Sequence, residues 1–510
     1  MGLYDFTFYD LIRRNAVCFR QQDAWFEVDD GRTITFAQFK DRVDRLAAGL
    51  QQAGITKGAR IGVVGKNCLE YFMLYGAAAA VGAIVLPVNW RLSVEEMLFN
   101  LNDGQPQLLF SDPEYQQQLE GHKDRLPSVK EFYNLKSPGS GFSDFGRLLE
   151  NDGVFEAVEV SADDGLVIIH TAAVAGRPRG ALLSHANLIC ANTHILLQSS
   201  GSAKGVHLNI LPLFHVGGLF MATAAFHAGA LNVNMSKFDA AQAAALIQEK
   251  KVSVIFDFAP ILSSILEAAE KSGKSLASLQ HVAGLEAPAV IEQYQQLTGG
   301  TFYCMYGQTE TSAIATMGRY SDRPGSAGKT VELADVCLVD DNDDPVATGE
   351  VGEIVVKGPV VFKGYWKLPE DTALTFRGGW HHTGDLGRFD ADGFLWYEGR
   401  KAEKELIKPG GENVYPAEVE KAILEHPDVE KTVVFGVPDP KWKEGIKAVC
   451  QLKEGTSLEA AELIEFVGAR IARFKKPQYV EFVTEFPRLE DGSPDRARVK
   501  ELYGGSQEQG

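Results

Sequence analysis

The sequence predicts an α/β protein in which a large N-terminal region is followed by a small α+β domain. Strand and helix patterns alternate from Ile34 to Asp112, and such alternation produces a parallel sheet covered by helices on both faces. After Pro409 the pattern changes to a helix, two strands, a second helix and a final strand. This last stretch holds about 100 residues, which is a typical size for a separate domain.

Composition is that of a globular protein and excludes two classes of partner. The chain has 510 residues, 45% hydrophobic and 23% charged, so its length predicts more than one domain. The net charge of −18 argues against nucleic acid and against stable membrane association, because both surfaces attract clustered basic charge. The six cysteines form no CxxC pair, so we expect no zinc site, no disulfides and a cytoplasmic location. The N-terminal stretch MGLYDFTFYDLIRRN lacks the basic start and apolar core of a secretory signal.

Apolar periodicity divides the N-terminal region into elements. Thr35 opens an amphipathic helix, and the apolar strand 61–64 follows it. The uncharged run 71–88 is barely long enough to cross a membrane, is rich in Ala and Gly, and is closed by Pro87. We therefore expect a buried helix there that leads into a core strand. A further helix is expected at 94–101, and further strands at 108–110, 166–170 and 302–306.

A loop of small residues follows the strand 166–170. It runs from Thr171 through Gly176 and Arg179 to Gly180. A small-residue loop beside a basic side chain suits the binding of phosphate by backbone N–H groups. The loop is not a Walker A motif, because no GK[ST] sequence follows at the required spacing.

Two further segments contain candidate polar residues. His215 lies in the apolar stretch LPLFHVGG, where a lone histidine is most often a core residue. The strand 302–306 ends at Tyr306 and is followed by the polar turn GQTET, which contains Glu310. A carboxylate suits Mg²⁺, which binds one or two acids together with nucleotide phosphates.

The stretch 383–420 holds an ordered set of polar and turn residues. Asp385 lies in a Thr-Gly-Asp turn, and its carboxylate suits a pair of sugar hydroxyls. Arg400 follows a predicted hairpin, and its rigid donor fork suits a phosphate or the same sugar. The charged run 401–405 is typical of a solvated connector, and the Pro-Gly-Gly sequence at 409–411 allows close approach of the backbone to a ligand. Taken singly, these pieces also fit a surface hairpin, a linker and a turn.

One similarity to a known motif is set aside. His381 and His382 resemble the start of the HHxxxD acyltransferase motif, but Asp385 is one residue too close. The two histidines also lack a spaced third ligand for a metal.

In their order along the chain, these segments resemble the adenylate-forming superfamily, which includes acyl-CoA synthetases, firefly luciferase and the adenylation domains of peptide synthetases. The loop after the strand 166–170 resembles the family's phosphate loop, TSGTTGxPKG, and the sequences YGQTE and TGD, with the later GR, match its nucleotide-binding motifs. The resemblance covers the chain from about Thr35 to Val499.

The resemblance implies a role for each matching residue. His215 would lie at the carboxylate end of the acyl pocket, and Phe256 to Pro260 would form a wall of it. Tyr306 would contact adenine and Asp385 the ribose. The catalytic candidates are Thr309 on the α-phosphate, Glu310 on Mg²⁺, Arg179 and His215. Expected contacts to nucleotide or CoA come from Thr171, Gly176, Gly180, Tyr306, Gly307, Gln308, Asp385, Arg400, Gly410 and Gly411.

Three departures from the family pattern affect the expected ligand contacts. The run 172–175 replaces Ser-Gly-Thr-Thr by Ala-Ala-Val-Ala, and each lost hydroxyl bond to a charged group costs about 1.5–3 kcal/mol. Leu285 and Glu286 occupy the glycine positions of the turn against adenine. Ser493 stands where the family has a lysine that bridges the substrate carboxylate and the α-phosphate. The candidates to supply that charge are Arg179, Arg488, Arg496 and Arg498.

The implied fold is α/β, with a large N-terminal adenylate-forming domain of stacked sheets and helices at 1–400, a small mobile α+β lid at 401–505 and a disordered tail at 506–510. The implied activity is that of an AMP-forming acyl-CoA synthetase. It would use ATP, Mg²⁺ and CoA to convert a carboxylic acid, with a fatty acid expected first, into an acyl-adenylate and then a thioester. Two alternatives are a catalytically weakened homologue that binds nucleotide or acyl ligand, and acyl transfer to a carrier protein. A homodimer is a further expectation.

Overall fold

The structure, a computed structural model, describes residues 5–136, 141–171, 178–199, 205–401, 406–412, 414–440, 442–489 and 493–504. Contacts group the chain into two units. Unit 1 comprises Met1–Trp90, Asn100–His170 and Gly180–Gly399, and unit 2 comprises Arg91–Phe99, Thr171–Arg179 and Arg400–Gly510. The domain limits predicted from the sequence stay a prediction.

A seven-stranded sheet leads to the ends of the phosphate loop. Across the sheet the strands are β18 (Gly364–Tyr365), β8 (Arg179–Ser184), β7 (Gly165–Thr171), β4 (Ile84–Val88), β3 (Arg60–Val64), β5 (Leu108–Ser111) and β6 (Glu131–Asn134). The strands from β7 to β6 pair in parallel, which confirms the sheet predicted from the strand and helix alternation. The helices of this part are α1 (Phe8–Cys18), α2 (Phe36–Gln52), α3 (Leu69–Val81), α4 (Val94–Gly104) and α5 (Pro113–Glu120).

Helices α2 and α3 show how the sequence determines burial. Before α2, the Thr35 hydroxyl accepts from Gln38 N, and the Gln38 side chain accepts from Thr35 N, which forms a capping box. The apolar face of α2, including Phe39, is buried. α3 is apolar apart from Glu70 in its first turn, and all of its residues are buried, so the run 71–88 is a core helix followed by β4, as predicted. Among the described residues, no helix is long and apolar enough to cross a membrane.

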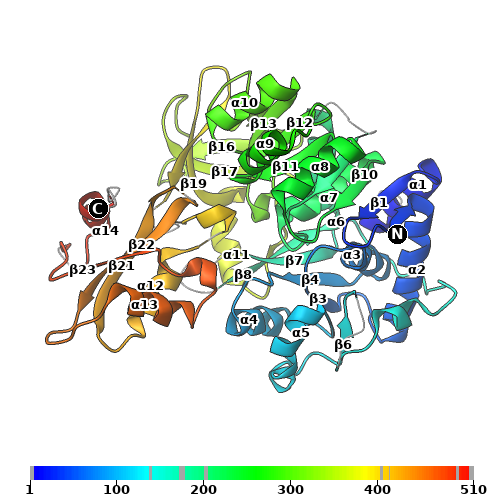
Figure 1. Ribbon diagram of the computed structural model, residues 1–510, viewed down its shortest axis with the longest axis horizontal. Coiled ribbons are helices and arrows are strands. Elements are labelled where there is room, and N and C mark those ends of the chain that lie inside the picture. Colours follow the sequence, from blue (N-terminus) through cyan, green and yellow to red (C-terminus); the bar gives the residue numbers. More distant parts are fainter. Residues whose placement is uncertain are drawn as a thin grey trace. The chain divides into compact units, whose positions relative to one another are not determined.

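A nine-stranded sheet ends at the YGQTE sequence. Its order is β15 (Lys329–Thr330), β14 (Thr316–Arg319), β13 (Thr301–Tyr306), β12 (His281–Leu285), β11 (Val254–Phe258), β9 (Val206–Asn209), β10 (Leu231–Asn234), β1 (Asp23–Glu27) and β2 (Thr33–Thr35). Its helices are α6 (His185–Gln198), α7 (Val216–Ala228), α8 (Ala240–Lys250), α9 (Ile261–Ser272) and α10 (Pro288–Thr298). α8, α9 and α10 run along this sheet (Figure 1). β14 returns antiparallel to β13, so the turn between them carries YGQTE.

A four-stranded sheet carries the TGD sequence. Its order is β16 (Asp335–Val339), β17 (Gly352–Lys357), β19 (His381–Phe389) and β20 (Leu395–Arg400), and α11 (Pro369–Thr375) precedes β19. Between β19 and β20, Asp390 N donates to Phe394 O at 3.0 Å and Gly393 N donates to Asp390 O at 3.0 Å. The predicted hairpin is therefore confirmed.

The C-terminal part of unit 2 is a small α+β structure. Strands β21 (Val429–Asp439) and β22 (Lys443–Leu452) pair antiparallel, and β23 (Tyr479–Val483) joins β22 in parallel. α12 (Pro416–Leu424) and α13 (Ala460–Gly468) pack together against this sheet (Figure 1), and α14 (Arg496–Tyr503) contacts β21. Alternation along β21 places Val434 in the cluster of α12 and α13, and Val433 and Phe435 in a second cluster with Phe486. The predicted order of elements is confirmed.

Short 3-10 helices complete the described structure. They are η1 (Lys123–Arg125), η2 (Phe145–Leu149), η4 (Thr309–Thr311), η5 (Arg377–Gly379), η7 (Pro409–Gly411) and η8 (Arg473–Lys475).

Candidate active site

The turn after β13 requires glycine and left-handed backbone. A Cβ at Gly307 would lie 2.3 Å from the carbonyl oxygen of Ala313, so only glycine fits there. Ser312 and Ala313 have φ angles of 56° and 72°, which fold the chain back towards β14. The turn fixes η4, on which Thr309 and Glu310 lie.

The TGD turn in β19 is held by a buried carboxylate. Thr383 Oγ1 donates to Ile354 O at 2.6 Å and accepts from Asp385 N at 3.1 Å. Gly384 has a φ of 72°, and its N–H donates to Glu353 Oε1 at 2.8 Å. Because Glu353 is 3% exposed, this contact is shielded from water and holds the turn in place.

The two turns meet at the side chain of Asp385. Tyr306 OH donates to Asp385 Oδ2 at 2.7 Å, and Gln308 Nε2 donates to the same oxygen at 3.1 Å. Gln308 Nε2 also lies 3.4 Å from Thr383 O. Asp385 is 1% exposed. The structure therefore brings together Tyr306, Gln308 and Asp385, which the sequence places in two separate motifs.

Glu310 is buried beside this cluster. Its Oε1 accepts from Tyr365 OH at 2.9 Å, and its backbone carbonyl accepts from Phe362 N at 3.0 Å. Thr309, its neighbour on η4, is also buried. Mg²⁺ needs only one or two protein carboxylates beside nucleotide phosphates, so the donor chemistry of Glu310 fits this ion.

His215 caps the start of α7 and is not a buried core residue. Its side chain is partly exposed, and its Nδ1 accepts from Gly217 N at 3.3 Å. A Cβ at Gly217 would lie 2.8 Å from the ring of Phe256 and 3.6 Å from His215 Nδ1. Phe256 in turn meets Phe258 edge to face at 5.3 Å. An aromatic wall therefore stands next to His215.

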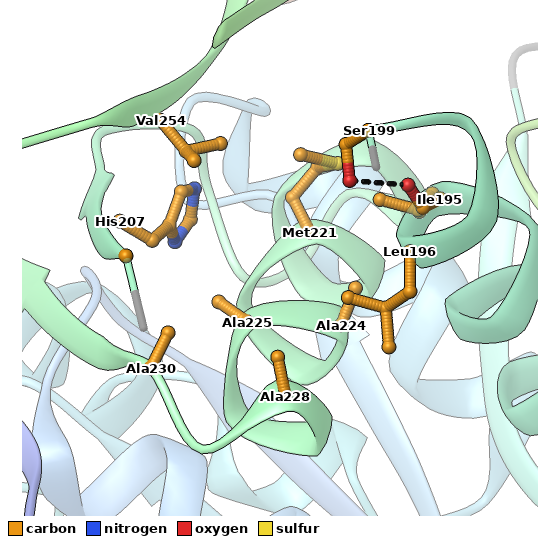
Figure 2. A pocket seen from close by; sticks show the side chains of 11 residues that line it. Ile195, Leu196, Ser199, His207, Met221, Ala224, Ala225, Ala228, Ala230 and Val254 are labelled. Atoms are coloured by element: carbon orange, nitrogen blue, oxygen red, sulfur yellow. Dashed lines mark hydrogen bonds between the residues drawn. The ribbon is translucent and has the colours of Figure 1, made fainter. Parts of the chain in front are cut away.

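A small apolar cavity lies further along α7. Figure 2 shows side chains of α7, α6 and nearby strands around this space of about 30 Å³. Met221, Ala228 and Val254 contribute apolar atoms, and the ring of His207 contributes the polar edge. The volume suits one water molecule. Its lining contains none of the predicted site residues, so we do not assign it to a substrate.

A glycine precedes the turn expected against adenine. A Cβ at Gly284 would lie 1.8 Å from the carbonyl oxygen of Asp257, so this position admits no side chain. After it, Leu285 is 57% exposed, and the buried Glu286 accepts from Ala287 N through Oε1 at 2.7 Å. Leu285 and Glu286 therefore come after the point where the backbone of Gly284 approaches that of Asp257, and they leave this approach intact.

The ends of the phosphate loop are described, but its centre is not. Thr171 Oγ1 donates to Arg179 O at 3.3 Å, which joins the two ends within unit 2. Gly180 belongs to unit 1, and a Cβ there would lie 2.7 Å from Ile168 Cγ2. Gly176 lies outside the described residues.

The remaining candidates belong to unit 2. Arg400 Nη1 donates to Tyr415 OH at 3.5 Å. Gly410 has a φ of 59°, its N–H donates to Trp442 O at 3.4 Å, and a Cβ there would lie 2.9 Å from the Trp442 ring. Gly411 follows in η7. The predicted Pro-Gly-Gly turn thus rests against an indole ring.

Comparison with known families decides the class of protein. The profile of the AMP-binding enzyme family matches residues 13–366, and that of the AMP-binding enzyme C-terminal domain matches residues 418–492. The chain belongs to the AMP-binding enzyme family. This is the adenylate-forming acyl- and aryl-CoA ligase family, whose members act on small carboxylic acids and use ATP, Mg²⁺ and CoA.

Relatives of the enzyme span different acids. It is 33% identical to an indoleacetate–CoA ligase of Aromatoleum aromaticum, over 92% of this chain and 93% of that protein. It is 32% identical to a feruloyl-CoA synthase of an Amycolatopsis species, over 93% and 95%. A fatty acyl CoA synthetase structure from Mycobacterium tuberculosis is 28% identical, covers 98% of both chains and has a TM-score of 0.74.

Sequence reasoning assigned no supporting role to the residues that hold the two motifs in place. Glu353 accepts from the N–H of Gly384 and so holds the TGD turn. His381 contacts Gln308, and Thr375 contacts His381. Glu353 had a readable signal, since it is an acid at the start of the apolar strand GEIVV. His381 and Thr375 had none, because their contacts depend on how β19 and α11 pack.

Proposed function

We propose that the enzyme is an AMP-forming acyl-CoA synthetase that joins a hydrophobic carboxylic acid to CoA through an acyl-adenylate. The observation that supports this best is the contact of Tyr306 and Gln308 with Asp385, next to Glu310. These side chains combine an aromatic ring, a sugar-binding carboxylate and a metal-binding carboxylate within unit 1.

Asp385 is suited to the ribose of ATP. In the structure its Oδ2 accepts from the hydroxyl of Tyr306 and the amide of Gln308. Ribose hydroxyls are donors of the same kind, and a carboxylate has acceptor sites on both of its oxygens, so Asp385 can receive the ribose while Gln308 keeps its contact. The nearby ring of Tyr306 would then be available to adenine.

The first half-reaction depends on positioning and charge neutralisation. The substrate carboxylate attacks the α-phosphorus, and pyrophosphate leaves. Thr309 would donate to the α-phosphate, and Arg179 would offer its guanidinium fork. Mg²⁺ held by Glu310 would neutralise phosphate oxygens when bound.

In the second half-reaction the CoA sulfur attacks the acyl carbon, and AMP leaves. The acyl-adenylate must be retained while CoA enters. We propose that the C-terminal domain, with Gly410 and Gly411 in its CoA-facing loop, moves between the two steps.

The substrate class is open between two kinds of hydrophobic acid. A fatty acid is the class expected from the sequence, and a fatty acyl CoA synthetase is among the structural relatives. An aryl or arylalkanoic acid is supported by the names of two relatives and by the rings of Phe256 and Phe258 next to His215. Edge-to-face contact with such rings favours an aromatic substrate group. We therefore place the aryl class first.

A second candidate function, ligand binding with weak adenylation, rests on a specific observation. Ser493 carries no charge, and each nearby arginine is engaged with a carboxylate. Arg496 lies 2.5 Å from Glu420, Arg488 lies 3.1 Å from Glu485, and Arg498 pairs with Glu501. An arginine that replaced the charge lost at Ser493 would have to leave its carboxylate. This costs little for Arg488 and Arg498, whose ion pairs are exposed, but Arg496 would also give up its bond to the carbonyl oxygen of Val434.

A panel of acids tests the proposal. Purified enzyme with ATP and Mg²⁺ is given fatty, alicyclic, aryl and arylalkanoic acids, with and without CoA, while pyrophosphate, AMP and thioester are measured. We expect pyrophosphate, AMP and an acyl-CoA mass with at least one hydrophobic acid. Thioester formed on a phosphopantetheine carrier protein but not on CoA would assign the carrier alternative. If the enzyme binds ATP but no acid gives pyrophosphate, AMP or thioester, the result would favour ligand binding with weak adenylation.

A further inference from the structure

His381 lies in β19 with its ring enclosed by aromatic side chains. The ring meets Phe362 at 5.4 Å and Phe376 at 6.1 Å, both edge-on, and His381 is 2% exposed. We propose that His381 is a positioning residue of the nucleotide site, and that its protonated ring holds Gln308 against Asp385 in the arrangement that binds a nucleoside. The proposal rests on the proposed function, in which Asp385 receives the ribose.

The hydrogen bonds of Gln308 fix which way its amide points. Its Nε2 faces Asp385 Oδ2 at 3.1 Å and Thr383 O at 3.4 Å, and a carboxylate and a carbonyl oxygen only accept. The amide oxygen Oε1 must therefore face His381 Nε2, which lies 3.2 Å away. Because an amide oxygen only accepts, His381 Nε2 carries a proton.

The contacts of Thr375 indicate whether the other ring nitrogen, His381 Nδ1, also carries a proton. Thr375 Oγ1 lies 3.1 Å from His381 Nδ1 and 3.1 Å from the carbonyl oxygen of His382. One hydroxyl proton serves only one of these two acceptors if the ring is neutral. If Nδ1 is also protonated, it donates to Thr375 Oγ1, which donates to His382 O, and every buried contact is satisfied. The geometry therefore favours the imidazolium form.

The charged groups beside the neighbouring His382 come from β17, η5 and the segment before β17. Glu353 Oε2 lies 3.2 Å from the neighbouring His382 ring and 3.2 Å from Arg377. Asp343, before β17, lies 3.1 Å from Arg377 Nε and 3.8 Å from His382 Nδ1. These acids are engaged with Arg377 and His382, and burial of the His381 ring opposes a charge on it. The two hydrogen bonds that the imidazolium form donates therefore carry the proposal.

Protonation of His381 has a defined consequence for nucleotide binding. A charged ring polarises the Gln308 amide and strengthens its bond to Asp385, because hydrogen bonds in series reinforce one another. It also adds positive charge near an anionic ligand. Nucleotide affinity therefore falls as the pH rises through the pKa of His381. A rise of one unit in this pKa on binding corresponds to about a tenfold gain in affinity.

The test compares wild type with His381→Phe in binding of adenosine 5′-monophosphate, by calorimetry at pH 6 and pH 8. The phosphate titrates in both proteins, so its effect cancels in the ratio of their dissociation constants. We expect wild type to bind about tenfold more tightly than the variant at pH 6, and the advantage to shrink towards one at pH 8. A ratio that is the same at both pH values overturns the proposal. His281→Phe, which removes a histidine from β12, is the matched control.

Two further variants make the result decisive. Thr375→Val keeps the ring but removes the acceptor of Nδ1, so the midpoint of the pH dependence moves to lower pH. The Cε1 proton of His381 reports the same shift by NMR, and an unchanged midpoint contradicts the proposal even where His381→Phe fails to fold.

Asp385→Asn separates this inference from the proposed function. Wild-type affinity in Asp385→Asn would reject the nucleotide site itself, whereas lost binding there with a constant His381 ratio would reject only the role of His381.

Discussion

At the scale of single residues, Asp385 is where the two nucleotide motifs meet. Asp385→Asn is expected to weaken ATP binding about 10- to 100-fold, because each ribose bond to a carboxylate contributes about 1.5–3 kcal/mol. Calorimetric titration with ATP measures the change. Asp392→Asn makes the same substitution in an exposed turn, where the side chain is 66% exposed, and is expected to bind ATP normally. Equal affinity in Asp385→Asn and wild type would remove the ribose assignment.

Ser493 offers a second prediction at this scale. Ser493→Lys is expected to speed acyl-adenylate formation at least tenfold, below a ceiling of about 10²–10³ for a positioned electrostatic group. The reason is that Arg496, a candidate substitute, is bound to Glu420 and to the carbonyl oxygen of Val434. Single-turnover formation of acyl-AMP is the measurement.

The matched control adds the same charge elsewhere in unit 2. Ser457→Lys changes an exposed serine before α13 and is expected to leave the adenylation rate unchanged. Equal rates for Ser493→Lys, Ser457→Lys and wild type would show that the C-terminal stretch around Ser493 takes no part in the first half-reaction.

At the scale of elements, a buried lysine joins helices within unit 2. Lys475 in η8 contacts Glu418 on α12 and lies 2.7 Å from Glu96 on α4. Burial alone would lower the pKa of Lys475, but the two carboxylates outweigh it and the pKa is raised. The raised pKa means that the ion pairs stabilise the fold throughout the neutral range and are lost only as the pH rises through that pKa.

Removing this lysine is expected to destabilise unit 2. Lys475→Met would leave the buried Glu418 and the partly buried Glu96 without their cation, at a cost of about 3–5 kcal/mol. Thermal unfolding followed by calorimetry gives the shift in Tm. The neighbouring Lys476 pairs with the exposed Glu465, so Lys476→Met is expected to leave the Tm nearly unchanged. Similar Tm values for the two variants would contradict this reading of Lys475.

Elements with local signals were predictable, and their contacts were not. The hairpin after β19 follows from Asp390 to Gly393, because turn residues act over a few positions. The contact of His381 with Gln308 spans 73 residues, and that of Arg496 with Glu420 spans 76. Local composition predicts neither contact, since both depend on how separate elements pack.

At the scale of the whole molecule, buried histidines link stability to pH. Burial lowers the pKa of His185, His207 and His227 from 6.5 to about 4. These side chains are neutral when folded, whereas the unfolded chain binds protons below pH 6.5. The contribution of these three histidines to the free energy of unfolding is therefore constant above pH 6.5, and it falls as the pH drops towards 4.

His207→Gln isolates one of these contributions. A glutamine can still donate to Asn232, as the His207 ring does at 2.8 Å, but it does not titrate. Between pH 6.5 and pH 5 the variant is expected to lose about 2 kcal/mol less stability than wild type in urea unfolding. His122→Gln, at a partly exposed site, serves as the control. An identical pH dependence in His207→Gln and wild type would refute this linkage.

The fold class and the family were readable from the sequence, and the substrate was not. Patterns such as YGQTE and TGD combine a turn with its chemistry in a few residues, so their place at the ends of β13 and in β19 follows from local structure. The acyl pocket depends on side chains from separate strands and helices, such as Phe256 and Gly217, whose approach only the folded chain defines.

The most direct test of the central claim is carboxylate-dependent exchange of labelled pyrophosphate into ATP in the absence of CoA. This exchange reports the acyl-adenylate step alone, before any thioester forms. We predict exchange with at least one hydrophobic acid in wild type, little in Asp385→Asn, and none without acid or Mg²⁺. If wild type binds ATP but shows no exchange with any acid of the panel, the chain does not adenylate a carboxylate and the account of its chemistry is wrong.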